Sequence, residues 1–218
     1  MGKVQIITKE QQAILDEVGH DDFFRSNFYL TGGTALSAFY LQHRYSDDLD
    51  FFSPVKLDNQ IIFTLISKWS AKHHFTFQSR FVEVVYIFDL VFANKKSLKV
   101  DFAYYPYRRV EKGQSVKGVD IDSLTDIAIN KLLVISQRTD VKDFVDLYFL
   151  FKKFSFWDLM EGVRIKFRVE LEPFLLAADF LKVEDFDYLP KMSVDLTLEE
   201  LKTFFRQKAK EVGGKAVR

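Results

Sequence analysis

Apolar residues recur with two different periods along the chain, and the period changes near residue 122. Before that point, short apolar runs with a period of two indicate β-strands, and helix-like runs lie between them. The expected strands cover residues 28–30, 48–52, 75–79, 83–92, 97–105 and a short stretch near 116–120. The expected helices cover residues 8–18, 34–43 and 58–72. The turn residues Asn94–Lys96 predict an antiparallel hairpin between the last two long strands.

Beyond residue 122 the apolar spacing is helical. Capping boxes at Ser123 and Thr197 predict two helix starts, and Gly213–Gly214 are expected to end the last helix. The expected helices cover residues 124–138, 140–154, parts of 155–188, and 197–212. We therefore predict an α/β core over residues 1–122 and a helical region, residues 123–218, packed on it.

Composition removes several function classes. The chain has 218 residues and no cysteine, which excludes disulfides, thiolate catalysis, zinc fingers and iron–sulfur clusters. Lys+Arg and Asp+Glu are both 31, so a protein that coats nucleic acid non-specifically is not expected, and RNA contact would need a local basic patch. Apolar runs are too short to cross a bilayer, and we expect a cytoplasmic protein without a membrane partner. The four histidines are expected at the surface or at helix caps, and the two tryptophans in the core.

Two stretches could bind an anion and a cation. Gly32, Gly33 and Thr34 lie between an expected strand and an expected helix, where glycine lets the backbone approach a phosphate closely. A plain strand-to-helix turn would use the same residues. Further on, Asp48 and Asp50 share one face of an expected strand, while Leu49 and Phe51 share the other face and can enter the core. Adjacent carboxylates repel unless a cation such as Mg²⁺ lies between them, although a solvated acidic strand edge is the alternative.

Asp101 is the candidate for a third carboxylate. Its neighbours in the expected strand are apolar and face away from it. If this strand lies beside the one carrying Asp48 and Asp50, three carboxylates converge as in a two-metal phosphoryl-transfer site. Glu83 and Asp89 are competing candidates for the third position, and Asp101 by itself could equally face solvent.

Two expected helices carry charges that could contact phosphates. Lys131 and Arg138 are seven residues apart on the first helix, and Lys142 and Asp146 are four apart on the second. Such cations could hold phosphates opposite the metals. The alternative is surface ion pairs that contribute roughly 0.3–0.5 kcal/mol each.

The order of these motifs resembles that of a known family. The segments GGTAL (32–36), RYSDDLDF (44–51), DIAINK (126–131) and RTDVKDFVDLY (138–148) follow one another within residues 28–151. They resemble the motifs GGT-A-L, R-x-S-x-D-L-D-F, D-x-A-x-x-K and R-x-x-x-K-D-x-x-D-L-Y of the AbiEii/AbiGii toxin family. The last third of the chain carries no such resemblance.

The resemblance implies an α+β fold: a polymerase-β-like nucleotidyltransferase core with a mixed sheet, followed by a helical C-terminal part. It also implies the role of each site residue. These roles are Asp48, Asp50 and Asp101 as catalytic ligands of two Mg²⁺ ions, Gly32, Gly33 and Thr34 as a triphosphate cradle, Lys131 and Lys142 as phosphate contacts, Asp146 as a residue orienting Lys142, and Arg44 and Ser46 as loop or phosphate contacts. Asp101 would also polarise or deprotonate the acceptor hydroxyl.

The function implied by the resemblance is that of a bacterial toxin in a toxin–antitoxin or phage-defence pair. Such an enzyme moves a nucleotide from an NTP to an acceptor such as RNA, tRNA in particular, or a protein, and a cognate antitoxin protein is an expected partner. Two alternatives remain open at this point. One is a non-catalytic nucleotide-binding interaction module, and the other is a kinase-like phosphotransferase of the same fold.

Overall fold

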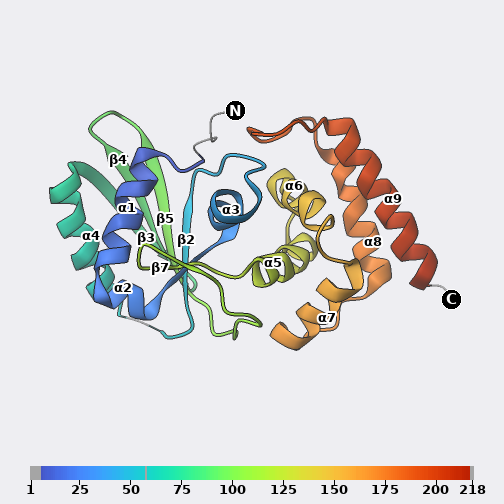
Figure 1. Ribbon diagram of the computed structural model, residues 1–218, viewed down its shortest axis with the longest axis horizontal. Helices are drawn as coiled ribbons and strands as arrows, with labels where there is room; N and C mark the ends of the chain where they lie inside the picture. The colour runs from blue at the N-terminus through green and yellow to red at the C-terminus, as the bar shows by residue number, and fades with distance from the viewer. Residues whose placement is uncertain (1–5, 57, 217–218) are drawn as a thin grey trace. The chain divides into compact units, whose positions relative to one another are not determined.

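The computed structural model describes residues 6–56 and 58–216, which form two compact units (Figure 1). The first unit holds the residues up to 40 together with 46–108 and 112–123. The second holds residues 41–45, 109–111 and those from 124 onward. The two units are therefore interleaved in the sequence, since a short segment from each of two loops belongs to the helical unit.

A five-stranded mixed sheet forms the centre of the first unit. Its order is β1 (Tyr29–Thr31), β2 (Leu49–Ser53), β5 (Ser97–Tyr104), β4 (Val85–Phe92) and β3 (Phe75–Val82). The pair β2–β5 is parallel, and the other neighbouring pairs are antiparallel. The mixed sheet and the hairpin of β4 and β5 confirm the predicted fold. The short strand expected near 116–120 is a small hairpin of β6 (Ser115–Val116) and β7 (Val119–Asp120).

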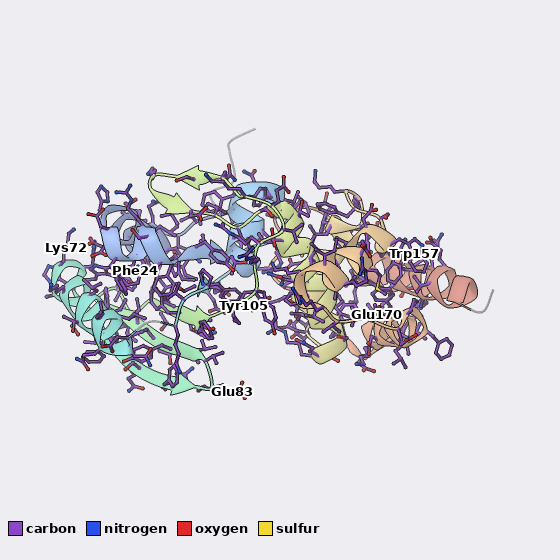
Figure 2. All side chains as sticks on the ribbon, turned by 90° about the horizontal axis from the view of Figure 1, so that it is seen from below. Phe24, Lys72, Glu83, Tyr105, Trp157 and Glu170 are labelled. Atoms are coloured by element: carbon purple, nitrogen blue, oxygen red, sulfur yellow. The ribbon has the colours of Figure 1, made fainter. Side chains whose placement is uncertain are left out.

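Helices α1 (Lys9–His20), α2 (Asp22–Asn27) and α4 (Asn59–His73) lie along one face of this sheet (Figure 1). The ring of Phe24 lies 4.8 Å from that of Trp69 and 5.1 Å from that of Phe102, between helices and sheet (Figure 2). Thr8 and Gln11 form a capping box that starts α1. Since apolar side chains fill this face, the polar residues of β2 and β5 are left on the opposite one.

The helical unit contains α5 (Leu124–Gln137), α6 (Val141–Leu150), α7 (Phe156–Phe167), α8 (Pro173–Leu181), a 3₁₀ turn η2 (Lys182–Asp185) and α9 (Leu198–Ala216). Asp140 caps α6, and the capping box of Thr197 and Glu200 starts α9, as predicted. The segment 41–45 joins this unit through backbone hydrogen bonds, from Tyr45 N to Lys191 O (2.9 Å) and from Ser193 N to His43 O (3.0 Å).

Three expectations about individual residues are wrong. Helix α9 continues through Gly213 and Gly214, where the sequence predicted its end. A Cβ on Gly213 would lie 3.7 Å from that of Ala177, so α9 and α8 approach closely there. Trp157 is 44% exposed rather than part of the core (Figure 2). His43 is buried rather than at the surface, because its ring binds a carboxylate.

Within the described residues, no helix combines the length and the apolar character that crossing a bilayer requires.

Candidate active site

The parallel pairing of β2 and β5 brings two of the candidate carboxylates together. Asp50 lies directly opposite Asp101 in the register of the two strands. Their neighbours Phe51 and Phe102 are also paired, and their rings stack 5.3 Å apart on the helix-covered face. Because side chains alternate along a strand, Asp50 and Asp101 share the opposite face. The strand adjacency on which the three-carboxylate hypothesis depended is thus confirmed.

Asp48 lies two residues before Asp50, just ahead of β2, and is half-buried. Its carboxylate approaches the same point from the strand end, because Asp48 Oδ2 lies 4.0 Å from Lys99 Nζ and Asp101 Oδ2 lies 2.7 Å from it. Lys99 was not singled out from the sequence. The sequence does not show where the ammonium group of this lysine lies, because its position depends on residues of neighbouring strands.

Gly32 lies against the carboxylate of Asp50, the third acid of this group. It begins α3 (Gly32–Leu36) with a φ of +70°, a left-handed backbone conformation that favours glycine. A Cβ at this position would clash with Asp50 Oδ2. Thr34 in the same turn is buried, and its hydroxyl donates a hydrogen bond to the carbonyl oxygen of Asp48. The glycine motif and the acidic motif are therefore in direct contact, with Gly33 buried between Gly32 and Thr34.

In this group of acids, the pKa values of Asp101 and Lys99 are shifted. Burial raises the pKa of Asp101 above its ordinary value, and the neighbouring Lys99 only partly opposes this. Burial lowers the pKa of Lys99, but its hydrogen bond to Asp101 and the charges of Asp101, Asp48 and Asp50 outweigh burial and raise it overall. The ammonium therefore stays charged and serves as the counter-ion of the carboxylates.

The donor set fits an oxygen-seeking divalent cation. Among the described residues, the buried Oδ1 atom of Asp101 has no hydrogen-bond partner, so its lone pairs are left for a ligand. In the present side-chain arrangement, no three His, Asp or Glu side chains of the described residues converge as a metal-binding group. In this arrangement Asp48 and Asp101 flank Lys99, and Asp50 faces Gly32. Carboxylate oxygens are the ligands that Mg²⁺ prefers.

The competing acids occupy different positions. Asp89 lies on β4 opposite Lys99, one strand further from Asp50, and its carboxylate pairs with Arg80. Glu83 is exposed in the turn between β3 and β4, at the outer end of this hairpin (Figure 2). Of the three acids weighed as the third carboxylate, Asp101 is the one opposite Asp50.

A second charged cluster lies within the helical unit and centres on Asp146 of α6. Arg44 donates two hydrogen bonds to this carboxylate, from Nε to Oδ1 at 2.7 Å and from Nη2 to Oδ2 at 2.8 Å. His43 Nε2 lies 2.7 Å from Oδ1, and Lys131 Nζ lies 2.6 Å from Oδ2. Lys131 also binds Asp143 at 2.6 Å. Asp146, His43 and Arg44 are almost completely buried.

Burial would raise the pKa of Asp146, but the charges of Lys131 and Arg44 and the hydrogen bonds from Arg44 and His43 hold it well below its usual range. Burial would likewise lower the pKa of Lys131, which Asp146 and Asp143 instead raise. Burial would also lower the pKa of Arg44, which Asp146 instead raises, so Asp146, Lys131 and Arg44 all stay ionised. Removing one partner from a buried ion pair of this kind strongly destabilises the fold, because the other charge is left buried without compensation.

From the sequence, four residues of this unit were assigned to nucleotide or phosphate binding: Arg44, Lys131, Lys142 and Asp146. Arg44 and Lys131 are held by carboxylates, and Lys142 is exposed on α6. The partners that the structure gives Asp146 are Arg44, His43 and Lys131 rather than Lys142. Ser46, in the first unit, is half-buried, and its carbonyl oxygen accepts a hydrogen bond from Gln11. The burial of His43 has no local sequence signal, since its partner lies 103 positions away.

The motifs and their geometry agree with a comparison against known families. The family described as "Nucleotidyl transferase AbiEii toxin, Type IV TA system" matches residues 13–212. The chain belongs to the AbiEii family. As a member, it is a nucleotidyltransferase, and the family is one of toxins. A relative from Aquifex aeolicus (strain VF5), the uncharacterized protein aq_aa25, is 33% identical over 212 residues, which cover 94% of this chain and 97% of the relative.

Solved structures show the same fold as this AbiEii member. A putative nucleotidyltransferase from H. pylori superimposes with a TM-score of 0.58 at 21% identity, covering 96% of this chain and 94% of the other. JHP933 from Helicobacter pylori gives 0.57 at 19% identity, with coverage of 97% and 95%. MenT4, the nucleotidyltransferase toxin Rv2826c from Mycobacterium tuberculosis H37Rv, gives 0.52 at 13% identity, with coverage of 93% and 84%. The nucleotidyltransferase fold predicted for the chain is confirmed.

Proposed function

We propose that this AbiEii member transfers a nucleoside monophosphate from an NTP to an acceptor hydroxyl in a Mg²⁺-dependent reaction, with Asp48, Asp50 and Asp101 as the ligands of two ions. The observation that carries the proposal is the β2–β5 register, which puts Asp50 opposite Asp101 beside the turn of Gly32. The orphaned Oδ1 atom of Asp101 supports it. A structural role alone would give no reason to leave this buried oxygen without a donor.

In the proposed reaction, the acceptor oxygen attacks the α-phosphorus of the NTP in line with the leaving group. A new P–O bond forms to the acceptor, and the bond to the β-phosphate oxygen breaks, releasing pyrophosphate. We assign the acceptor proton to the carboxylate of Asp101. Bound Mg²⁺ would supply the positive charge that offsets the charge growing on the phosphate oxygens. Gly32, Gly33 and Thr34 would let the triphosphate approach the backbone.

Lys131 and Lys142 are assigned as further phosphate contacts, and Arg44 and Ser46 as residues that hold the loop before β2, with Asp146 keeping Arg44 and Lys131 in place. Of these, Lys142 is the exposed cation. The acceptor class we propose is RNA, tRNA in particular, or a protein hydroxyl, and the toxin family implies a cognate antitoxin as partner.

The test is incubation with each of the four α-³²P-labelled NTPs, Mg²⁺ and total bacterial RNA, followed by separation of RNA from protein. Label on RNA or on the protein, lost in Asp50→Asn while the melting temperature is kept, supports nucleotide transfer and identifies the acceptor class. Label that moves only from the γ position would instead indicate a kinase-like phosphotransferase. Undiminished α-label transfer by a folded Asp50→Asn variant would contradict the assigned site.

A further inference from the structure

The chain's own ammonium group occupies the position between two of the three carboxylates. Lys99 Nζ lies 2.7 Å from Asp101 Oδ2 and 4.0 Å from Asp48 Oδ2. The Lys99 side chain is 34% exposed, whereas that of Asp101 is 13% exposed. The contact is therefore shielded on the Asp101 side and open on the Lys99 side. An ammonium in this place binds Oδ2 of Asp101, whose Oδ1 atom has no hydrogen-bond partner, so a divalent cation held by the same carboxylate would lie close to the ammonium.

A second carboxylate is available to the same lysine. Asp89 on β4 lies directly opposite Lys99 on β5 in the antiparallel register. Side chains of directly opposite residues share a face, with Cβ atoms roughly 5 Å apart, well within the reach of a lysine. Asp89 is 42% exposed and pairs with Arg80, whose own side chain is 51% exposed. This pair is open to water, so accepting a second cation at Asp89 requires no burial of charge.

We propose that Lys99 is an internal counter-ion that holds the carboxylates while they are without a metal and moves to Asp89 when a divalent cation binds. The proposal rests on the metal site of the proposed function. A divalent cation and an ammonium repel each other, so each disfavours the other when both lie at the carboxylate of Asp101. Lys99 is thus a positioning residue that sets the metal affinity, and Asp89 acts through Lys99 rather than as a ligand.

The size of the effect follows from the share of molecules in which Lys99 is away from the cluster. The apparent affinity for the cation is reduced by that share. If Lys99 leaves in roughly one molecule in ten, its removal tightens binding about tenfold. Removal of Asp89 takes away the alternative position and weakens binding, provided that Lys99 is present.

The experiment is equilibrium binding of Mn²⁺, with free Mn²⁺ measured by electron paramagnetic resonance, to the full chain without nucleotide. The variants are Lys99→Met, Asp89→Asn, the double variant, Asp50→Asn, and Lys68→Met as a matched control at an exposed position of α4. We expect Lys99→Met to bind about tenfold more tightly than the wild type, Asp89→Asn to bind several-fold more weakly, and the double variant to match Lys99→Met. Lys68→Met should behave as the wild type.

The double variant separates the proposal from direct ligation. If Asp89→Asn weakened binding equally with and without Lys99, Asp89 would be a ligand and the proposal would be overturned. Equal affinities of Lys99→Met and the wild type would also overturn it. Binding that is unaffected by Asp50→Asn would instead refute the metal site itself, so the two failures are distinguishable.

Melting in the presence of EDTA provides a second measurement. Lys99→Met should melt at a lower temperature than the wild type without metal, because the carboxylates lose their counter-ion, and should gain more from added Mn²⁺. A variant that melts as the wild type does under both conditions would contradict the counter-ion role.

Discussion

Replacing Gly32 with any residue that carries a Cβ should disturb the candidate site. Its φ is +70°, and an added Cβ would meet Asp50 Oδ2. We expect Gly32→Ala to lose about 1–3 kcal/mol of stability and most of its transfer activity, because the carboxylate must move away from its position. Unfolding in urea and the α-label assay measure the two effects.

Gly214→Ala is the matched control for this change. Gly214 lies in α9 with nothing within 4 Å of its added Cβ, so alanine should leave stability unchanged or raise it by up to about 1 kcal/mol. Equal behaviour of the two variants would show that the turn at Gly32 is not constrained by Asp50.

Asp146 should dominate the acid sensitivity of the fold. The pKa of Asp146 is far lower in the folded protein than the value of about 3.9 expected in the unfolded chain. The resulting stabilisation is complete above about pH 4 and is lost as the pH falls through the folded-state pKa. We expect Asp146→Asn to cost about 3–5 kcal/mol at pH 7, because Arg44 and Lys131 lose a buried partner, and to cost less at pH 3.

Urea unfolding at the two pH values measures this, with the exposed Asp187→Asn as the control. A cost that is the same at pH 7 and pH 3 would argue against an ionised Asp146.

At the scale of single residues, the alternation around Asp48 and Asp50 was readable from the sequence because a strand has a strict period of two. Leu49 and Phe51 are fully buried, and Asp50 is half-buried, as that period requires. The places of His43 and Lys99 could not be read in this way. Their positions depend on partners in other elements and on side-chain rotation, which leave no periodic signal.

At the scale of elements, the long strands and helices were predictable and the short or closely packed ones were not. The six-residue α2 is too short to show a period, and Asp21 defines its start by accepting hydrogen bonds from Phe23 and Phe24. The last helix passes through two glycines because no left-handed turn is needed there. In the described part of the chain, glycines with positive φ are Gly32 and Gly118.

Helices α5 and α7 give a prediction at this scale. A Cβ on Gly162 of α7 would lie 2.5 Å from Ile129 Cδ1 of α5, so the two helices meet at a glycine. We expect Gly162→Ala to lose about 1–3 kcal/mol through overpacking. In a double-mutant cycle, Ile129→Ala should cost less in the Gly162→Ala background than in the wild type, since it removes the clash. Additive costs in thermal or urea unfolding would contradict close packing at this position.

At the scale of the whole molecule, the change of apolar period predicted a single domain boundary near residue 122. By their contacts, residues 41–45 and 109–111 belong with the helical unit. Asp126 illustrates this: its carboxylate was expected in a capping box, and it accepts hydrogen bonds from the backbone of Val110 and Glu111 and from Lys166. Contacts between distant segments of this kind have no signature in the local pattern.

A fragment of residues 124–218 should therefore unfold with low cooperativity, because Asp146 and Asp126 lose partners that lie earlier in the chain. Circular dichroism during heating, compared with the full-length protein, measures this. A sharp transition at the temperature of the intact chain would show that the early segments contribute nothing to the helical unit.

The interleaving also bears on how relatives of this protein can exchange parts. Recombination at one crossover would transfer the helical region without Arg44, and the recipient's own segment would then have to match a foreign Asp146. Gene shuffling within the family should therefore yield functional hybrids chiefly when residues 41–45 and 109–111 travel with the C-terminal part. The segments of this protein that must be exchanged together are those in contact with one another, not those that are contiguous in the sequence.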